Sequence, residues 1–308
     1  MHTNSPNPEI SIVVPAYNED EVIGPFLQKL RQVVEENHWQ AEILVVDDGS
    51  SDRTAEVARQ AGIRLLQHPY NIGYGAALKT GYRHARGKVI VTIDGDGQHN
   101  PSDIAHLLAL IDRYDMVVGS RSHGSQTALH RDLANSIYNR LASYITRRKI
   151  EDLTSGLRAV RAPIVRQFMY LLPNTFSSSA TITLSVLRAG YSLAYVPIRV
   201  TRRAGKSKSK IRLIEDGLRF LLIILKIAVF FSPLKVFVPL SLVMFLLGVG
   251  YGLVRVLLWH TNYGSTSALL ISTSVLIFMV GLVSEQIAQL RFDRSESAFP
   301  FSDESGEK

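Results

Sequence analysis

Between residues 10 and 118, short apolar runs alternate with amphipathic stretches. The runs have the length and β-branched content of strands, whereas the stretches between them repeat their apolar residues at helical spacing. This pattern predicts strands at 10–14, 43–46, 63–66, 89–93 and 116–118. It predicts helices at 19–36, 54–61, 76–85 and 104–111. Strands separated by helices indicate an α/β fold, here a doubly wound, mostly parallel sheet with helices on both faces.

The pattern changes after about residue 205, where long apolar segments begin. Val236–Val254 and Thr261–Ser284 contain no charged residue, and each is long enough to cross a bilayer, which takes about 20 residues. The short link 255–260 makes them a helical hairpin. Because Lys and Arg flank its outer ends, the positive-inside rule places both ends on the cytoplasmic side. Two buried core helices are the alternative, but a complete α/β domain does not need them.

These changes divide the chain into four predicted parts. Residues 1–210 form the α/β domain, and residues 233–290 form two transmembrane helices. Residues 211–232 contain the apolar stretch Leu213–Phe231 with four charged side chains, so we expect interfacial helices lying on the membrane surface. Residues 291–308 form a polar cytoplasmic tail. Since the N-terminus has no apolar core of a secretory signal, we expect the first domain in the cytoplasm, at the plasma (inner) membrane.

The net charge of +7 favours negatively charged partners, and the absence of cysteine excludes disulfides, zinc–thiolate sites and cysteine nucleophiles. Seven Lys or Arg residues and no acidic residue lie between residues 199 and 212. This basic strip either holds the chain to anionic lipid or binds a phosphate group, and the two interpretations are compatible. Because the strip adjoins the membrane segments, binding of nucleic acid is not favoured.

Three polar clusters follow predicted strands: Pro15–Glu19, Asp47–Asp52 and Asp94–His99. In a doubly wound sheet such clusters gather in one crevice beyond the carboxyl ends of the strands. Asp94 and Asp96 are two residues apart on an extended chain, so both carboxylates can face one ion. Two carboxylates with open coordination positions suit Mg²⁺ or Mn²⁺. An isolated D-x-D pair more often belongs to a surface turn. The position of this pair after a strand, together with the other two clusters, favours a metal site.

The adjacent Asp47 and Asp48 have two interpretations. One of them can form an Asx turn before the next helix. Two neighbouring carboxylates after a buried strand are costly without partners, and a nucleoside offering N–H and hydroxyl groups would supply them. Two other motifs fail: Gly73-Tyr74-Gly75 lacks the third glycine of a dinucleotide fingerprint, and Gly205-Lys206-Ser207 lacks the first glycine of a P-loop.

Together these motifs resemble the family 2 glycosyltransferases with a GT-A fold, and among them the polyprenyl-phosphate glycosyltransferases, the group of dolichol-phosphate mannose synthase. The resemblance runs from about Ile10 to Lys210 and rests on the order of its motifs. They are Ile12–Glu19, Val45–Ser50, Asp94–His99, Gly119–Arg121, Asp152–Gly156 and Arg202–Lys208. Gly95 and Gly97 depart from the usual Ala and Leu, and Leu157 replaces an aromatic residue. A Q-x-x-R-W motif is absent, which argues against a processive synthase.

The resemblance implies roles for individual residues. Nucleotide-sugar contacts would come from Pro15, Ala16, Tyr17, Glu19, Asp47, Asp48, Gly75, Asp94 and Gly95. The metal, Mg²⁺ or Mn²⁺, would be held by Asp94, Asp96 and Gln98. The acceptor phosphate would meet Arg121, Arg131, Arg202, Ser207 and Lys208. Asp94, Asp96, Arg121 and Arg131 would be the catalytic residues.

The implied reaction is inverting transfer of a hexose from a GDP-mannose or UDP-glucose type of donor to a polyprenyl phosphate, undecaprenyl or dolichyl, at the cytoplasmic membrane face. Two alternatives stay open. The acceptor can be a molecule other than a polyprenyl phosphate, or the chain can be a lipid-binding membrane scaffold with a degenerate domain. A homo-oligomer is compatible with the sequence but not required by it.

Overall fold

The computed structural model describes residues 8–121, 146–175, 177–201, 228–258 and 262–298, together with positions 136, 139, 140, 142–144, 225 and 260. Arg131, Arg202, Ser207, Lys208 and most of the expected interfacial segment 211–232 lie outside these residues. The chain divides into two compact units, residues 1–213 and residues 214–308, which are taken separately below.

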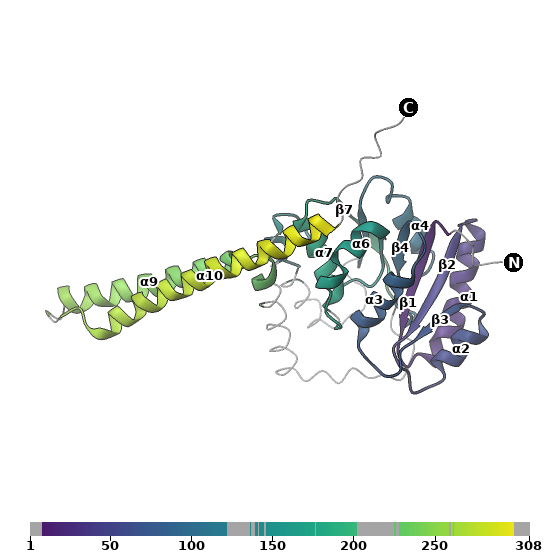
Figure 1. Ribbon diagram of the computed structural model, residues 1–308, viewed down its shortest axis with the longest axis horizontal. Helices are drawn as coiled ribbons and strands as arrows, with labels where there is room; N and C mark the ends of the chain where they lie inside the picture. The colour runs from purple at the N-terminus through teal and green to yellow at the C-terminus, as the bar shows by residue number, and fades with distance from the viewer. Residues whose placement is uncertain are drawn as a thin grey trace, which may run out of the picture. The chain divides into compact units, whose positions relative to one another are not determined.

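The first unit is built on a seven-stranded sheet with strand order β3-β2-β1-β4-β6-β5-β7 (Figure 1). The strands are β1 (Ile10–Ala16), β2 (Ala41–Asp47), β3 (Arg64–Gln67), β4 (Val89–Thr92), β5 (Met116–Arg121), β6 (Arg158–Arg161) and β7 (Leu193–Ile198). Every neighbouring pair is parallel except those of β6, which runs antiparallel to β4 and β5. The prediction of a mostly parallel α/β sheet is confirmed.

Helices cover both faces of this sheet. They are α1 (Asp20–Glu36), α2 (Thr54–Gln60), α3 (Tyr74–His84), α4 (Asp103–Leu108), α6 (Ala162–Phe168), the 3₁₀ turn η1 (Met169–Leu171) and α7 (Ser178–Arg188). Successive strand residues point to opposite faces, and Ile12 packs into a core with α1, α2 and α4. On the other face, Gly81 of α3 lies against Val13, so closely that a Cβ there would be 2.3 Å from the valine side chain.

The apolar periodicity of α1 explains its position. Ile23, Phe26, Leu27, Leu30 and Val34 recur at helical spacing and are all buried in the core. The strands and helices predicted between residues 10 and 118 are all present, with ends shifted by a few residues. The two later strands, β6 and β7, were not predicted. β6 has only four residues and begins and ends with Arg, so it shows no strand periodicity.

The second unit contains the helices α9 (Leu234–Leu257) and α10 (Ser265–Ala298), which run side by side (Figure 1). By length and composition, Leu234–Leu257 and Ser265–Leu290 are two candidate membrane spans, with mean hydropathies of 2.1 and 2.2. Most of their exposed side chains are apolar. Gly281 lies under Phe237, and Gly248 lies under Leu270 and Ile271, so small residues bring the two helices close together.

Candidate active site

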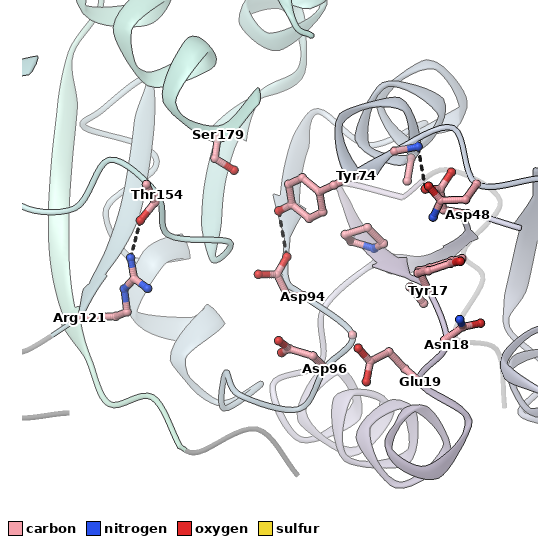
Figure 2. Close-up of a pocket in the computed structure, with 16 residues that line it drawn as sticks. Tyr17, Asn18, Glu19, Asp48, Tyr74, Asp94, Asp96, Arg121, Thr154 and Ser179 are labelled. Carbon is pink, nitrogen blue, oxygen red and sulfur yellow. Dashed lines mark hydrogen bonds between the residues drawn. The ribbon is translucent and has the colours of Figure 1, made fainter. Parts of the chain in front are cut away.

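A cavity of about 790 Å³ opens at the carboxyl ends of the strands in the first unit (Figure 2). Its walls come from the loops after β1, β2 and β4, the end of β5, the start of α3 and the start of α7. The lining residues are Pro15, Ala16, Tyr17, Asn18, Glu19, Asp48, Asn71, Gly73, Tyr74, Ala77, Asp94, Gly95, Asp96, Arg121, Thr154 and Ser179. The three polar clusters of the sequence therefore contribute to one cavity, as the sheet topology requires.

The loops after β1 and β2 are bonded to each other. Asn18, which has a positive φ of 54°, receives a hydrogen bond from the Ser51 amide at 2.9 Å and donates its own amide to Ser50 Oγ at 2.9 Å. The amide of Glu19 donates to Thr54 Oγ1 at 2.8 Å. These bonds hold the loop so that Tyr17, 44% exposed, and Glu19 line the cavity.

Asp47 and Asp48 are both buried, but they differ in position. Asp48 lines the cavity, and its carboxylate accepts the backbone amides of Ile72 at 3.0 Å and Gly73 at 2.8 Å. His68 Nδ1 lies 2.7 Å from the same carboxylate. Asp47 does not line the cavity, and its carboxylate accepts the amide of Ser50. The Asx-turn interpretation therefore describes Asp47, and Asp48 also fixes the loop that leads to α3.

Asp94 and Asp96 follow β4 and both line the cavity. Tyr74 Oη donates a hydrogen bond to Asp94 Oδ1 at 2.9 Å, and the backbone amide of Gln98 donates to Asp96 Oδ1 at 3.1 Å. His99 Nε2 lies 3.9 Å from Asp94 Oδ2. Burial lowers the pKa of His99, so this imidazole is favoured in its neutral form. Burial and the charge of Asp94 raise the pKa of Tyr74 well above its ordinary value, which keeps its hydroxyl a donor.

The pair Asp94 and Asp96 fits a hard divalent cation. Mg²⁺ and Mn²⁺ are commonly held by one or two carboxylates, with the remaining positions taken by water and substrate phosphates. Over the described part of the chain, no group of three or more His, Cys, Asp or Glu side chains could hold a metal ion. A cation bound by Asp94 and Asp96 would therefore need further ligands, such as water or the oxygens of a diphosphate.

Arg121 lines the cavity and is bound by a carboxylate. Its guanidinium makes a two-pronged pair with Asp152, at 2.7 and 2.9 Å. It also donates to Thr154 Oγ1 at 2.5 Å, as Figure 2 shows. Burial alone would raise the pKa of Asp152, but the hydrogen bonds and charge of Arg121 outweigh burial and lower that pKa. The D-x-x-S-G segment thus orients Arg121.

The structure places the remaining predicted site residues as follows. Pro15, Ala16 and Gly95 line the cavity, whereas Gly75 and Gln98 do not. Gly75 instead packs against the carbonyl of Pro173, which leaves no space for a Cβ. The sequence analysis did not assign a role to several lining residues: Asn71, Tyr74, Ala77, Thr154 and Ser179. The hydrogen bonds from the backbone amides of Ile72 and Gly73 to Asp48 hold the neighbouring Asn71 at the cavity. Backbone contacts of this kind cannot be predicted from the sequence.

The family model described as glycosyl transferase family 2 matches residues 11–168, which contain most of the residues that line this cavity. The chain belongs to glycosyltransferase family 2. A second family model, described as the GtrB C-terminal hairpin, matches residues 232–290. The expected enzyme class and the resemblance on which it rested are confirmed.

Two curated relatives of this glycosyltransferase show the extent of the similarity. An uncharacterized protein of Methanocaldococcus jannaschii is 34% identical over 201 residues, which cover 62% of this chain and 81% of the relative. The undecaprenyl-phosphate 4-deoxy-4-formamido-L-arabinose transferase of Salmonella choleraesuis is 33% identical over 196 residues, 59% of this chain. The match spans only 60% of the length of that transferase.

Among solved structures, glucosyl-3-phosphoglycerate synthase from Mycobacterium tuberculosis shares the fold. Its complex with Mn²⁺, uridine diphosphate and phosphoglyceric acid superposes with a TM-score of 0.57 at 19% identity, covering 72% of this chain and 78% of the synthase. This similarity confirms the GT-A fold for the first unit.

Proposed function

We propose that this glycosyltransferase transfers a hexose from a nucleotide-diphospho-sugar to a polyprenyl phosphate, with inversion, at the cytoplasmic face of the plasma (inner) membrane. The observation that carries the proposal is the joint presence of the Asp94–Asp96 pair in a large cavity and a C-terminal hairpin of the GtrB type. The relative from Salmonella choleraesuis is named as a transferase acting on undecaprenyl phosphate, which supports the same acceptor class here.

The order of side chains around the cavity supports one orientation of the bound nucleotide-sugar. Asp94 and Asp96 lie between Asp48 on one side and Arg121 on the other (Figure 2). We place the nucleoside near Asp48 and Tyr17, the diphosphate at Asp94 and Asp96, and the acceptor phosphate toward Arg121. Arg131, Arg202, Ser207 and Lys208, outside the described residues, remain proposed contacts for the acceptor phosphate.

The chemistry is a direct displacement. An oxygen of the lipid phosphate forms a bond to the anomeric carbon, while the bond from that carbon to the donor diphosphate breaks and its electron pair leaves with the nucleoside diphosphate. Because the nucleophile is anionic near neutral pH, a strong general base is not needed. Asp94 and Asp96 would hold a divalent cation, which when bound would neutralise the leaving diphosphate. Arg121, oriented by Asp152, would align the incoming phosphate.

The hairpin would place the enzyme at the membrane surface, where the phosphate of the acceptor lies. A polyprenyl tail stays in the bilayer, and its phosphate lies at the surface. The apolar helices α9 and α10 would anchor the enzyme at that surface, so the lipid would not have to leave the membrane. The basic strip between residues 199 and 212 would attract both the anionic lipid surface and the acceptor phosphate.

The test is a transfer assay with the full chain purified in detergent. It contains undecaprenyl phosphate, Mn²⁺ or Mg²⁺, and one radiolabelled nucleotide-sugar at a time. We expect label to enter the lipid phase from one donor and to be abolished by a chelator. Transfer to water-soluble acceptors but not to lipid would move the acceptor to another class. Absence of both transfer and nucleotide binding would favour the non-enzymatic scaffold.

A further inference from the structure

Gly73-Tyr74-Gly75, the segment that does not fit a dinucleotide fingerprint, lies at the start of α3, and its Gly73 and Tyr74 line the cavity. Its tyrosine hydroxyl donates to Asp94 Oδ1 at 2.9 Å. Figure 2 shows Tyr74 reaching across the cavity wall to Asp94, with Ser179 on the adjoining wall. One oxygen of the Asp94 carboxylate is therefore fixed by a side chain from another element.

The second oxygen of Asp94 is confined by the backbone. A Cβ on Gly156 would lie 1.9 Å from Asp94 Oδ2, so this oxygen packs directly over the glycine. With Tyr74 on one oxygen and Gly156 behind the other, rotation of the carboxylate is restricted. A carboxylate that is already oriented loses less conformational entropy when it binds an ion.

Tyr74 is itself held in place by its two glycine neighbours. The amide of Gly75 donates to the Asn174 carbonyl at 3.0 Å, and a Cβ there would lie 2.0 Å from the Pro173 carbonyl. A Cβ on Gly73 would lie 2.2 Å from the Asn174 carbonyl. The amide of Gly73 also donates to Asp48, at 2.8 Å. The first turn of α3 is thus seated tightly between the loop before α7 and the Asp48 carboxylate.

We propose that Tyr74 is a positioning residue of the metal site: its hydroxyl holds the Asp94 carboxylate in the orientation in which Asp94 and Asp96 bind a divalent cation together. The inference rests on the proposed function and extends it. Residues that orient metal ligands through hydrogen bonds typically change metal affinity by about 10–100-fold when they are removed. A tyrosine that merely satisfied its own hydroxyl through Asp94 would not change the affinity for metal.

The experiment compares Tyr74→Phe with Tyr82→Phe in the full chain. Tyr82 lies eight residues along the same helix and is completely buried, and in the described part of the chain its hydroxyl makes no hydrogen bond to Asp94 or Asp96. Mn²⁺ is titrated against each protein, alone and with uridine or guanosine diphosphate, and free Mn²⁺ is followed by electron paramagnetic resonance. The transfer rate is then measured as a function of Mn²⁺ concentration.

For Tyr74→Phe we expect the dissociation constant for Mn²⁺ and the Mn²⁺ concentration at half-maximal rate to rise together, by about tenfold. Saturating Mn²⁺ should then restore most of the rate, which a purely structural defect would not allow. Tyr82→Phe should leave both quantities unchanged. If Tyr74→Phe does not fold, Gly156→Ala is measured instead, because its Cβ would displace Asp94 Oδ2 and should raise the same two quantities.

Unchanged Mn²⁺ affinity in Tyr74→Phe would overturn the inference while leaving the proposed function intact, because the wild-type chain would still bind Mn²⁺ and transfer sugar. The inference would also be overturned if Tyr74→Phe lost transfer activity that excess Mn²⁺ did not restore while its affinity for Mn²⁺ was unchanged. A wild-type chain that binds no Mn²⁺ and transfers no sugar would overturn the proposed function together with the inference.

Discussion

The carboxylates around the cavity differ in what already binds them. Asp48 accepts two backbone amides and lies against His68, and Asp152 is paired with Arg121. Asp94 Oδ1 accepts the Tyr74 hydroxyl, and Asp96 Oδ1 accepts the backbone amide of Gln98. These two donors are uncharged, so they leave the carboxylates negative, as binding of a divalent cation requires. Asp48 and Asp152 instead position a loop and Arg121.

Asp96→Asn tests the metal ligand directly. The amide has nearly the same shape but no charge, so the chain should fold normally and lose transfer by about a hundredfold or more, since a metal supplies several kcal/mol of stabilisation to a developing charge. The measurement is the transfer rate at saturating metal. Asp112→Asn, an exposed change away from the cavity, serves as the control and should keep the wild-type rate. Near-normal activity of Asp96→Asn would contradict the assignment of Asp96 as a metal ligand.

Asp152→Asn tests the orienting pair. Removing the carboxylate leaves the Arg121 charge without this partner, and we expect a loss of about 2 kcal/mol in unfolding free energy, less than for a fully buried pair because Arg121 is partly exposed. The measurement is denaturant or thermal unfolding in detergent. Transfer should also fall, because Arg121 is no longer held toward the cavity.

The same pair predicts a pH dependence. The pKa of Asp152 is lowered in the folded chain, so its contribution to stability is complete above the ordinary aspartate pKa of about 3.9 and is lost as the pH falls through the folded value. The thermal midpoint of the wild-type chain should therefore drop below about pH 4. Asp152→Asn should show a shallower drop in that range, and an identical profile would contradict this account.

At this scale the sequence predicts the charged residues of the site better than the neutral ones. Asp48, Asp94 and Asp96 follow strands and were found by position, whereas Arg121, the last residue of β5, was assigned through the family resemblance. Thr154 lies in an irregular segment, and Ser179 lies at the start of α7. Only the tertiary structure brings the two residues to the cavity. Arg121 was found, but its partner Asp152 was not predicted to hold it, because a pairing between residues 31 positions apart depends on tertiary structure.

Among the elements, β6 shows what periodicity cannot detect. The strand is antiparallel to both neighbours and carries Arg158, whose guanidinium is fully buried and donates to the carbonyl of Ser179 at 2.7 Å. A buried arginine at the start of a four-residue strand is invisible to a search for apolar runs. β1, β2, β4 and β5 were predicted because their burial on both faces of the sheet makes them largely apolar, whereas the partly exposed edge strand β3 was predicted from its short apolar run.

The hairpin was predicted from length and apolar content, and its close packing leads to a further prediction. A Cβ on Gly281 would lie 2.6 Å from Phe237 Cβ, whereas a Cβ on Gly250 would meet nothing within 4 Å. Gly281→Leu should therefore push α9 and α10 apart and lower the stability of the hairpin by about 2 kcal/mol. Gly250→Leu, the matched control, should have no such effect. Thermal unfolding in detergent compares them, and equal midpoints would contradict the packing.

For the whole molecule, the proposed reaction needs the catalytic unit and both ends of the hairpin on the same side of the membrane. The sequence supports this topology because Lys235 lies at the start of α9, Arg291 and Arg294 lie at the far end of the hairpin, and only Arg255 is near the turn. An odd number of crossings would separate the ends and leave either the catalytic unit or the tail on the outer face. The two candidate spans in the described part of the chain give an even number.

The natural chain contains no cysteine, so single cysteines can report this topology without background labelling. Gln28→Cys lies on the exposed side of α1, and Asn262→Cys lies at the exposed turn between α9 and α10. In right-side-out membrane vesicles, a membrane-impermeant maleimide should label Asn262→Cys and leave Gln28→Cys unlabelled. In inverted vesicles the result should reverse, since the catalytic unit would then face the reagent. Labelling of Gln28→Cys from the outer face would contradict the cytoplasmic placement of the catalytic unit, and with it the access to a cytoplasmic nucleotide-sugar on which the proposed reaction depends.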